Sequence, residues 1–224
     1  MKIESINDFN SILKEAENGN SEAMNKVAEI YEFGLIIDKN EIIEINELLS
    51  FQWTKKSYEN GNIEATEKYA DYLSDNENKF CEQNIELAMK LYEKAMNCGS
   101  ENATFSLGIE YRNKGNFEKA FELYTKANES GKYHNELTIG LCLYYGIGTK
   151  KDKLKSLEVF KSINSKNNSE YEINEANYMI GKIYLEEEII EQSFEKARHY
   201  LELANKDGDH RSSQEILHLI GNKN

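Results

Sequence analysis

The chain has 224 residues, of which 39% are hydrophobic and 11% aromatic, and this composition excludes a chain that is disordered throughout. Aspartate and glutamate total 40 against 27 lysines and arginines, so the formal net charge is -13. This charge repels phosphate backbones and anionic lipids, which excludes nucleic acid and membranes as favoured partners. It would attract a basic protein or basic segment, although an acidic surface that only maintains solubility is an open alternative.

The amino-terminal segment MKIESINDFNSILKEA has acidic residues among its first positions and no apolar stretch of the length that a secretory signal needs. The longest apolar run, around IGLCLYYGIG, is far shorter than the roughly 18 residues of a membrane span. We therefore expect a cytoplasmic protein. Cys81, Cys98 and Cys142 form an odd set without CxxC spacing, which favours buried free thiols over a disulfide framework or a zinc site.

Glycines that end helical-looking stretches recur along the chain at intervals of 42, 38, 32 and 77 residues. They are Gly19, Gly61, Gly99, Gly131 and Gly208. A small or short residue follows each of them by four positions: Ala23, Ala65, Ala103, Asn135 and Ser212. The last interval is about two periods, and the segment NNSEYEINEANYMIGKIY supplies the missing unit. Periods of this length predict a solenoid of repeated helix pairs.

In chain order, a terminal helix is predicted at 7–19, followed by two repeat units at 20–61 and 62–99. The first helix of each unit carries two small residues five positions apart and usually an aromatic three positions further on. These residues are Ala23, Ala28 and Tyr31 in the first unit, and Ala65, Ala70 and Leu73 in the second, where leucine takes the aromatic place. The second helix of the second unit carries a small, large, small pattern: Ala88, Tyr92 and Ala95.

Three further units are predicted at 100–131, 132–172 and 173–208, and a terminal helix at 209–220 ends the array. First helices repeat the pattern at Ala103, Gly108 and Tyr111, and at Ala176, Gly181 and Tyr184. Second helices repeat theirs at Ala120, Tyr124 and Ala127, and at Ala197, Leu201 and Ala204. The whole of 1–224 is predicted to be a single repeat domain.

These spacings predict how the helices pack. Positions three, four, five and eight apart share one helical face because a turn takes 3.6 residues. Small residues let two helix backbones approach closely, and a large residue of one helix fills the groove opposite. A glycine at the end of each second helix supplies the left-handed cap that reverses the chain. Since proline is absent and no stretch shows strand alternation, we predict an all-α fold of about five antiparallel helix pairs with half-repeats at both ends.

Two families share these patterns. The unit from Glu101 to His134 is 34 residues long and resembles a tetratricopeptide repeat at Leu107, Gly108, Tyr111, Ala120, Tyr124 and Ala127. The segments YYGIGTKKD, YEFGLIIDKN and FQWTKKSYENGN resemble the Sel1-like repeat, whose helices are joined by a glycine-bearing loop that ends in aspartate. The chain departs from that pattern in long loops at 35–49 and 75–84, and at Ile36, Ser156 and Ile163, which replace small residues.

The resemblance implies a right-handed superhelix that binds another protein or peptide on its concave face, as an adaptor or scaffold without catalysis or cofactor. The first helices would line this face, with acidic residues at the amino-terminal end and apolar and aromatic ones further on. The candidate residues are Glu29, Glu32, Glu67, Asp71, Phe105, Ile109, Arg112, Leu141, Tyr144, Tyr145, Tyr178 and Lys182. Such a lining suits a ligand with hydrophobic anchors and a basic flank, although the aromatic residues could instead pack in the core.

Motifs for catalysis or metal binding are weak. The four histidines lack HExxH spacing: His134, His199, His210 and His218. The segment KDGDHRSS (206–213) fits an inter-repeat turn better than a cation site, and GIGTKKD lacks both GxxxxGK[ST] and a preceding strand. Three successive glutamates at 186–188 point in different directions on a helix and cannot act as a paired acid and base. We therefore predict no catalytic, cofactor or metal site, and no enzyme activity.

Two other functions stay open. The chain could be an immunity or inhibitor protein that neutralises a bacterial toxin or enzyme, because an acidic protein can cover the charge of a basic nuclease. Solenoids with Sel1-like repeats occur in bacterial toxin-immunity loci, and the richness in Asn, Lys and Ile fits an AT-rich bacterial genome. A small enzyme or metal protein built on the repeats is the third hypothesis. The sequence does not decide the oligomeric state.

Overall fold

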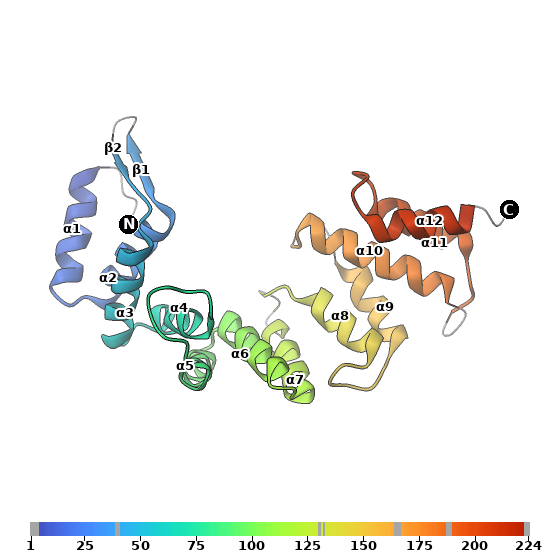
Figure 1. Ribbon diagram of the computed structural model, residues 1–224, viewed down its shortest axis with the longest axis horizontal. Helices are drawn as coiled ribbons and strands as arrows, with labels where there is room; N and C mark the ends of the chain where they lie inside the picture. Colours follow the sequence, from blue (N-terminus) through green and yellow to red (C-terminus); the bar gives the residue numbers. More distant parts are fainter. Residues whose placement is uncertain are drawn as a thin grey trace. The chain divides into compact units, whose positions relative to one another are not determined.

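The computed structural model describes residues 5–38, 41–129, 131, 133–163, 167–186 and 190–221. Twelve helices and one two-stranded hairpin occupy this part of the chain (Figure 1). The chain divides into two compact units, Met1–Glu110 and Tyr111–Asn224. In each unit consecutive helices pack on one another, so the predicted all-α fold of paired helices is confirmed.

The amino-terminal unit is built from five helices, the first ten residues of a sixth and the hairpin. The helices are α1 (Ile6–Glu17), α2 (Ser21–Phe33), α3 (Glu47–Glu59), α4 (Ile63–Ser74), α5 (Ile85–Asn97) and α6 (Glu101–Asn113), whose last turn belongs to the other unit. Helices α1 to α5 pack in chain order, each on the next. Helices α2, α4 and α6 are the first helices of their repeats, and α3 and α5 are second helices.

The helix ends follow from local sequence. Asn20, Asn46 and Asn62 each accept a hydrogen bond from a backbone N–H of the first helical turn through their side-chain oxygens. At the other ends, Gly61 (φ 86°) and Gly99 (φ 93°) adopt the left-handed region that a side chain would disfavour. The predicted glycine caps after second helices are therefore confirmed.

A β-hairpin lies between α2 and α3, where the sequence indicated no strand, and that expectation is wrong for this segment. Strands β1 (Leu35–Asp38) and β2 (Glu41–Ile43) are antiparallel, with Leu35 opposite Ile43. Ile43 is buried against Phe9 and Ile30, and the hairpin lies beside α1 and α2 (Figure 1). Strands of three or four residues are too short to show alternation, although their β-branched residues favour extended backbone.

The carboxy-terminal unit continues the pairing of helices. It contains α7 (Phe117–Asn128), α8 (Glu136–Tyr145), α9 (Lys153–Ser162), α10 (Glu170–Leu185), α11 (Phe194–Ala204) and α12 (Arg211–Gly221). Each packs on the next in chain order, and α8 also touches α10. Its core contains Phe160, Met179, Ile180 and Ile183 together with other buried apolar residues. Within the described ranges no helix is long and apolar enough to cross a membrane.

Close helix contacts occur where the small residues were predicted. A Cβ added to Gly181 on α10 would lie 2.8 Å from Cγ of Leu201 on α11, so the large residue fills the space that glycine leaves. Ala176, Ala197 and Ala204 are at most 2% exposed. The predicted meeting of small and large residues is therefore confirmed for this pair of helices.

The cysteines only partly follow the expectation. All three are free thiols, but only Cys142 is buried, whereas Cys81 is half-buried and Cys98 is exposed. Cys98 directly follows α5, where the chain turns towards the next repeat, and the expectation that it is buried is wrong.

Candidate protein-binding surfaces

The predicted binding residues all lie on first helices, and the structure places them in two separate units. The amino-terminal unit holds Glu29 and Glu32 on α2, Glu67 and Asp71 on α4, and Phe105 and Ile109 on α6. The carboxy-terminal unit holds Arg112 at the end of α6, Leu141, Tyr144 and Tyr145 on α8, and Tyr178 and Lys182 on α10. Two local groups within these sets are in contact, one on α2 and α4 and the other on α8 and α10.

The acidic group on α2 and α4 is held by hydrogen bonds and by ion pairs, one of which joins Lys26 Nζ to Glu29 at 2.9 Å. Lys68 Nζ lies 2.6 Å from a carboxylate oxygen of Glu32, which joins the two helices. The hydroxyl of Ser100 donates a hydrogen bond to the carboxylate of Glu67. Tyr92 Oη on α5 donates a hydrogen bond of 2.7 Å to Asp71. These contacts with Lys68, Ser100 and Tyr92 therefore fix the positions of the carboxylates of Glu32, Glu67 and Asp71.

The carboxylate of Asp71 is the strongly shifted titrating group of this surface. Restricted hydration among the surrounding protein atoms raises the pKa of Asp71 to about 6, and the negative charges of Glu67 and Glu32 also raise it. The hydrogen bond from Tyr92 and the charge of Lys68 act in the opposite direction without cancelling the effect. Ionised Asp71 is thus held in a surrounding that lacks sufficient positive charge.

A shallow hollow of about 290 Å³ opens beside Asp71. We name it the α2–α4 hollow, and it is lined by Glu32, Lys68, Asp71, Tyr72 and Asp75. Within the described residues, neither Asp71 nor Asp75 forms an ion pair. Three carboxyl groups therefore surround one ammonium group, which is an arrangement that favours an incoming cation.

The raised pKa of Asp71 predicts a pH-dependent cost to folding. Because the folded-state value of about 6 exceeds the ordinary 3.8, stability falls as pH rises through this window. Asp71→Asn retains an oxygen that accepts from Tyr92, and we expect it to raise the free energy of unfolding at pH 7.5 by up to about 1 kcal/mol, since solvent screens this exposed carboxylate. Urea denaturation at pH 7.5 and 3.5 measures the effect. An equal difference at both pH values would contradict the prediction.

The group on α8 and α10 consists of tyrosines around a lysine. Lys182 Nζ lies 5.2, 5.7 and 5.6 Å from the ring centroids of Tyr144, Tyr145 and Tyr178. The same nitrogen is 3.4 Å from Tyr145 Oη. Tyr145 is 54% exposed, and the edge-to-face contact of its ring with Tyr144 has a centroid distance of 4.7 Å. An exposed aromatic side chain is thus held in place by its neighbours.

Tyr144 lies in the core, which was the alternative left open for the aromatic residues, and not on the predicted binding surface. It is 4% exposed, and its hydroxyl donates a hydrogen bond to the carboxylate of Glu186. Lys153, whose side chain is 7% exposed, donates to the other oxygen of this carboxylate at 2.6 Å. Although partial burial opposes it, the hydrogen bonds from Lys153 and Tyr144 lower the pKa of Glu186 below its ordinary value. Tyr144 supports the surface without being accessible to a partner.

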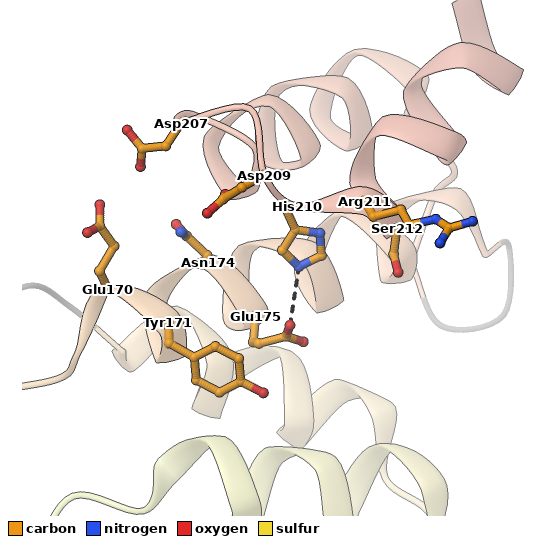
Figure 2. A pocket seen from close by; sticks show the side chains of 9 residues that line it. All are labelled: Glu170, Tyr171, Asn174, Glu175, Asp207, Asp209, His210, Arg211 and Ser212. Atoms are coloured by element: carbon orange, nitrogen blue, oxygen red, sulfur yellow. Dashed lines mark ion pairs between the residues drawn. The ribbon is translucent and has the colours of Figure 1, made fainter.

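A second hollow, of about 520 Å³, lies where α10 faces the turn between α11 and α12 (Figure 2). His210 Nε2 lies 3.3 Å from Glu175, and the imidazole contacts the Tyr178 ring at a tilt of 36° with a centroid distance of 4.9 Å. His210 Nδ1 also accepts a hydrogen bond from the backbone N–H of Ser213 in α12. Residues 206–210 therefore form an inter-repeat turn, as predicted, and 211–213 begin α12. In the described part of the chain, no three His, Cys, Asp or Glu residues are placed to hold a metal ion.

One exposed surface was missed by the sequence analysis. Four large apolar side chains near the hairpin are more than half exposed: Phe33, Ile36, Ile45 and Leu48. Two features of the sequence indicated that this segment is unusual. The 35–49 loop is longer than the repeat requires, and an isoleucine stands at a glycine position of the repeat. Exposure itself could not be predicted because it depends on the tertiary position of the hairpin.

Comparison with known proteins identifies the repeats. The Sel1 repeat model matches five segments: 21–62, 63–100, 103–132, 139–160 and 174–209. No curated protein matches the chain. The chain is similar in structure to c5321, a protective antigen of uropathogenic Escherichia coli with an SLR fold, with 23% identity and a TM-score of 0.72. This match covers 95% of the chain but only 44% of c5321.

Two further solved structures have the same fold. A Sel1 repeat protein from Oxalobacter formigenes is 22% identical with a TM-score of 0.66, over 89% of this chain and 75% of that one. A Sel1 repeat protein from Klebsiella pneumoniae subsp. pneumoniae is 21% identical with a TM-score of 0.53, over 95% and 99% of the two chains. At these identities the structures show a shared fold, whereas the repeat matches cover most of the sequence. The chain therefore belongs to the Sel1 repeat family, as its residues predicted.

Proposed function

We propose that the chain is a non-catalytic protein-binding module that recognises another polypeptide through side chains of its first helices. Sel1 repeat proteins generally bind other proteins, and the family is generally non-catalytic. The supporting observation is the exposed Tyr145 beside Tyr178 and Lys182 on α8 and α10. We name these three residues the tyrosine–lysine surface.

The tyrosine–lysine surface has the properties of a binding hot spot. Tyrosine offers a large apolar area and a polar hydroxyl with only two side-chain torsions to restrict, and it is enriched among residues that dominate binding energy. Tyr145 is already restrained by the Tyr144 ring and by Lys182, so little further ordering is needed on binding. The exposed ring would bury its free face against an apolar side chain of the partner.

Replacing Tyr145 tests the proposal. After affinity capture identifies a natural partner, we expect Tyr145→Ala to raise the dissociation constant of the purified pair at least about tenfold, which is typical for loss of an interface aromatic. Tyr171→Ala is the matched control, because Tyr171 is 68% exposed on α10 outside the tyrosine–lysine surface. Isothermal titration calorimetry measures both. Equal affinities of Tyr145→Ala and wild type would contradict the proposal, as would an equal loss in Tyr171→Ala.

Neutralisation of a basic toxin or enzyme is a second candidate, favoured by the net charge of -13 and by the α2–α4 hollow. If the chain neutralises a toxin, affinity capture should retain that one protein in a stable complex. If the chain is an adaptor, affinity capture should retain several unrelated proteins. Co-expression distinguishes the two functions. If co-expression of the chain restores the growth of cells that express the captured partner, neutralisation is supported. If cells with the partner grow equally with and without the chain, the adaptor is supported.

A further inference from the structure

Four exposed apolar side chains lie on the hairpin and on the chain segments that flank it. Phe33 is 71% exposed, Ile36 76%, Ile45 63% and Leu48 51%, and we name these four residues the hairpin patch. Single exposed hydrophobic residues are common on soluble proteins, but several from one segment mark an interaction surface. All four lie in the amino-terminal unit, on residues 33–48.

Strand geometry explains why Ile36 reaches solvent. Leu35 packs with Ile43 against the buried Phe9 and Ile30, so one side of the hairpin covers the unit. Ile36 follows Leu35 on β1 and is exposed, because successive side chains of a strand alternate between its two sides. Ile45 lies against the backbone of Gly34, where an added Cβ would be 3.3 Å from its Cγ1. Ile36 therefore lies on the hairpin, and Ile45 lies close to the Gly34 backbone that precedes it.

The hairpin patch adjoins the α2–α4 hollow. Lys68 Nζ lies 5.7 Å from the ring centroid of Phe33 and 2.6 Å from the carboxylate of Glu32, which precedes Phe33 in the chain. Further carboxylates are supplied by Glu44 and Glu47, which are exposed between the hairpin and the first turn of α3. Apolar contact area and excess negative charge thus occur side by side on one unit.

We infer that the hairpin patch and the α2–α4 hollow form one docking surface for an amphipathic, basic segment of a partner protein. Apolar side chains of this segment would cover Phe33, Ile36 and Ile45. An adjacent arginine or lysine would enter the hollow and pair with Asp71 and Asp75, which form no ion pair within the described residues. The inference rests on the proposed protein-binding function but concerns a different surface in the other unit.

Charge complementarity identifies this occupant. An acidic segment, or a second copy of a chain with net charge -13, would bring like charges together at the hollow. A guanidinium group would instead find carboxylates that have too little positive charge around them, and it can bind a carboxylate through two parallel hydrogen bonds. Cation binding would also offset the unfavourable surroundings of ionised Asp71, whose pKa is about 6 in its absence.

Selection from a phage-displayed library of random 12-residue peptides tests this inference on the full chain. We expect the enriched peptides to combine aromatic or aliphatic residues with arginine or lysine. Synthetic copies of them should bind at least about tenfold more weakly to the double variant Ile36→Ser/Ile45→Ser and several-fold more weakly to Asp71→Asn. Leu219→Ser, at a residue 63% exposed on α12, is the control and should bind as wild type does. Circular dichroism establishes that each variant is folded.

Several results would overturn the inference. These are failure to enrich any peptide, enrichment of acidic or uncharged ones, and equal weakening by Leu219→Ser, which would indicate non-specific adhesion. Sedimentation that shows a wild-type dimer, dissolved by the double variant, would assign the patch to a second copy instead. The proposed function is tested separately by Tyr145→Ala with a natural partner, so loss of the hairpin surface would leave it intact.

Discussion

Gly140→Ala is expected to lower the free energy of unfolding by about 2 kcal/mol, within the range of overpacked cores. A Cβ at Gly140 on α8 would lie 2.4 Å from Cε1 and 2.8 Å from Cδ1 of Phe160 on α9. The Phe160 side chain is 0% exposed, so its ring cannot move away without disturbing other buried residues. In an open helix the same substitution would stabilise by about 1 kcal/mol, and the steric effect reverses that sign. Urea denaturation followed by circular dichroism measures the change.

Two further variants isolate the steric cause. Gly221→Ala is the control, because a Cβ at this end of α12 meets no heavy atom within 4 Å, and its stability should match or slightly exceed wild type. The double variant Gly140→Ala/Phe160→Leu makes room for the new methyl group and should lose less than the two single changes together. Wild-type stability in Gly140→Ala would mean that α8 and α9 do not pack as closely as described.

Helix pairing could be predicted because close packing restricts the size of individual residues. Wherever two helix backbones approach closely, a small side chain is required. This requirement can be seen at single positions of the sequence, such as Gly181, which faces Leu201. Chain reversal is equally local, since the left-handed backbone at Gly61 and Gly99 favours glycine. Repetition of these positions made the family recognisable without any knowledge of the tertiary structure.

The sequence could not predict in the same way which side chains of the first helices are exposed to solvent. Tyr144 and Tyr145 are neighbours on α8, yet one is 4% and the other 54% exposed. Nearly every side of α8 is apolar, so its sequence does not indicate which side is covered by α9 and α10. The sequence placed Tyr144, Tyr145 and Lys182 on one lining and left a core role open for the tyrosines, but it did not distinguish the buried tyrosine from the exposed one.

Long-range charge pairs were also beyond prediction from one sequence. Lys153 and Glu186 are 33 residues apart, and their contact depends on how α9 and α10 pack. Glu186 begins a run of three glutamates for which the sequence analysis named no partner, and the structure pairs it with Lys153. No local pattern marks which of several charged residues pairs with a buried lysine.

Glu186→Gln is expected to lower the free energy of unfolding at pH 7 by about 1 to 2 kcal/mol, a value reduced for partial solvent exposure. The change weakens the pairing of Lys153, whose side chain is 7% exposed, and replaces a charged acceptor of the Tyr144 hydroxyl by a neutral one. Because the folded-state pKa of Glu186 lies below the ordinary 4.5, its contribution is present above pH 4.5 and is lost as pH falls through the folded-state value.

Thermal unfolding at pH 7 and pH 3 therefore provides the decisive comparison for Glu186. The gap in melting temperature between wild type and Glu186→Gln should be several degrees at pH 7 and should narrow at pH 3, because pH 3 lies below the ordinary pKa of 4.5, where the contribution of the carboxylate charge is being lost. Glu158→Gln on α9 is the control, since Glu158 is exposed and forms no ion pair within the described residues. A gap that is equal at both pH values would show that the carboxylate contributes by shape and not by charge.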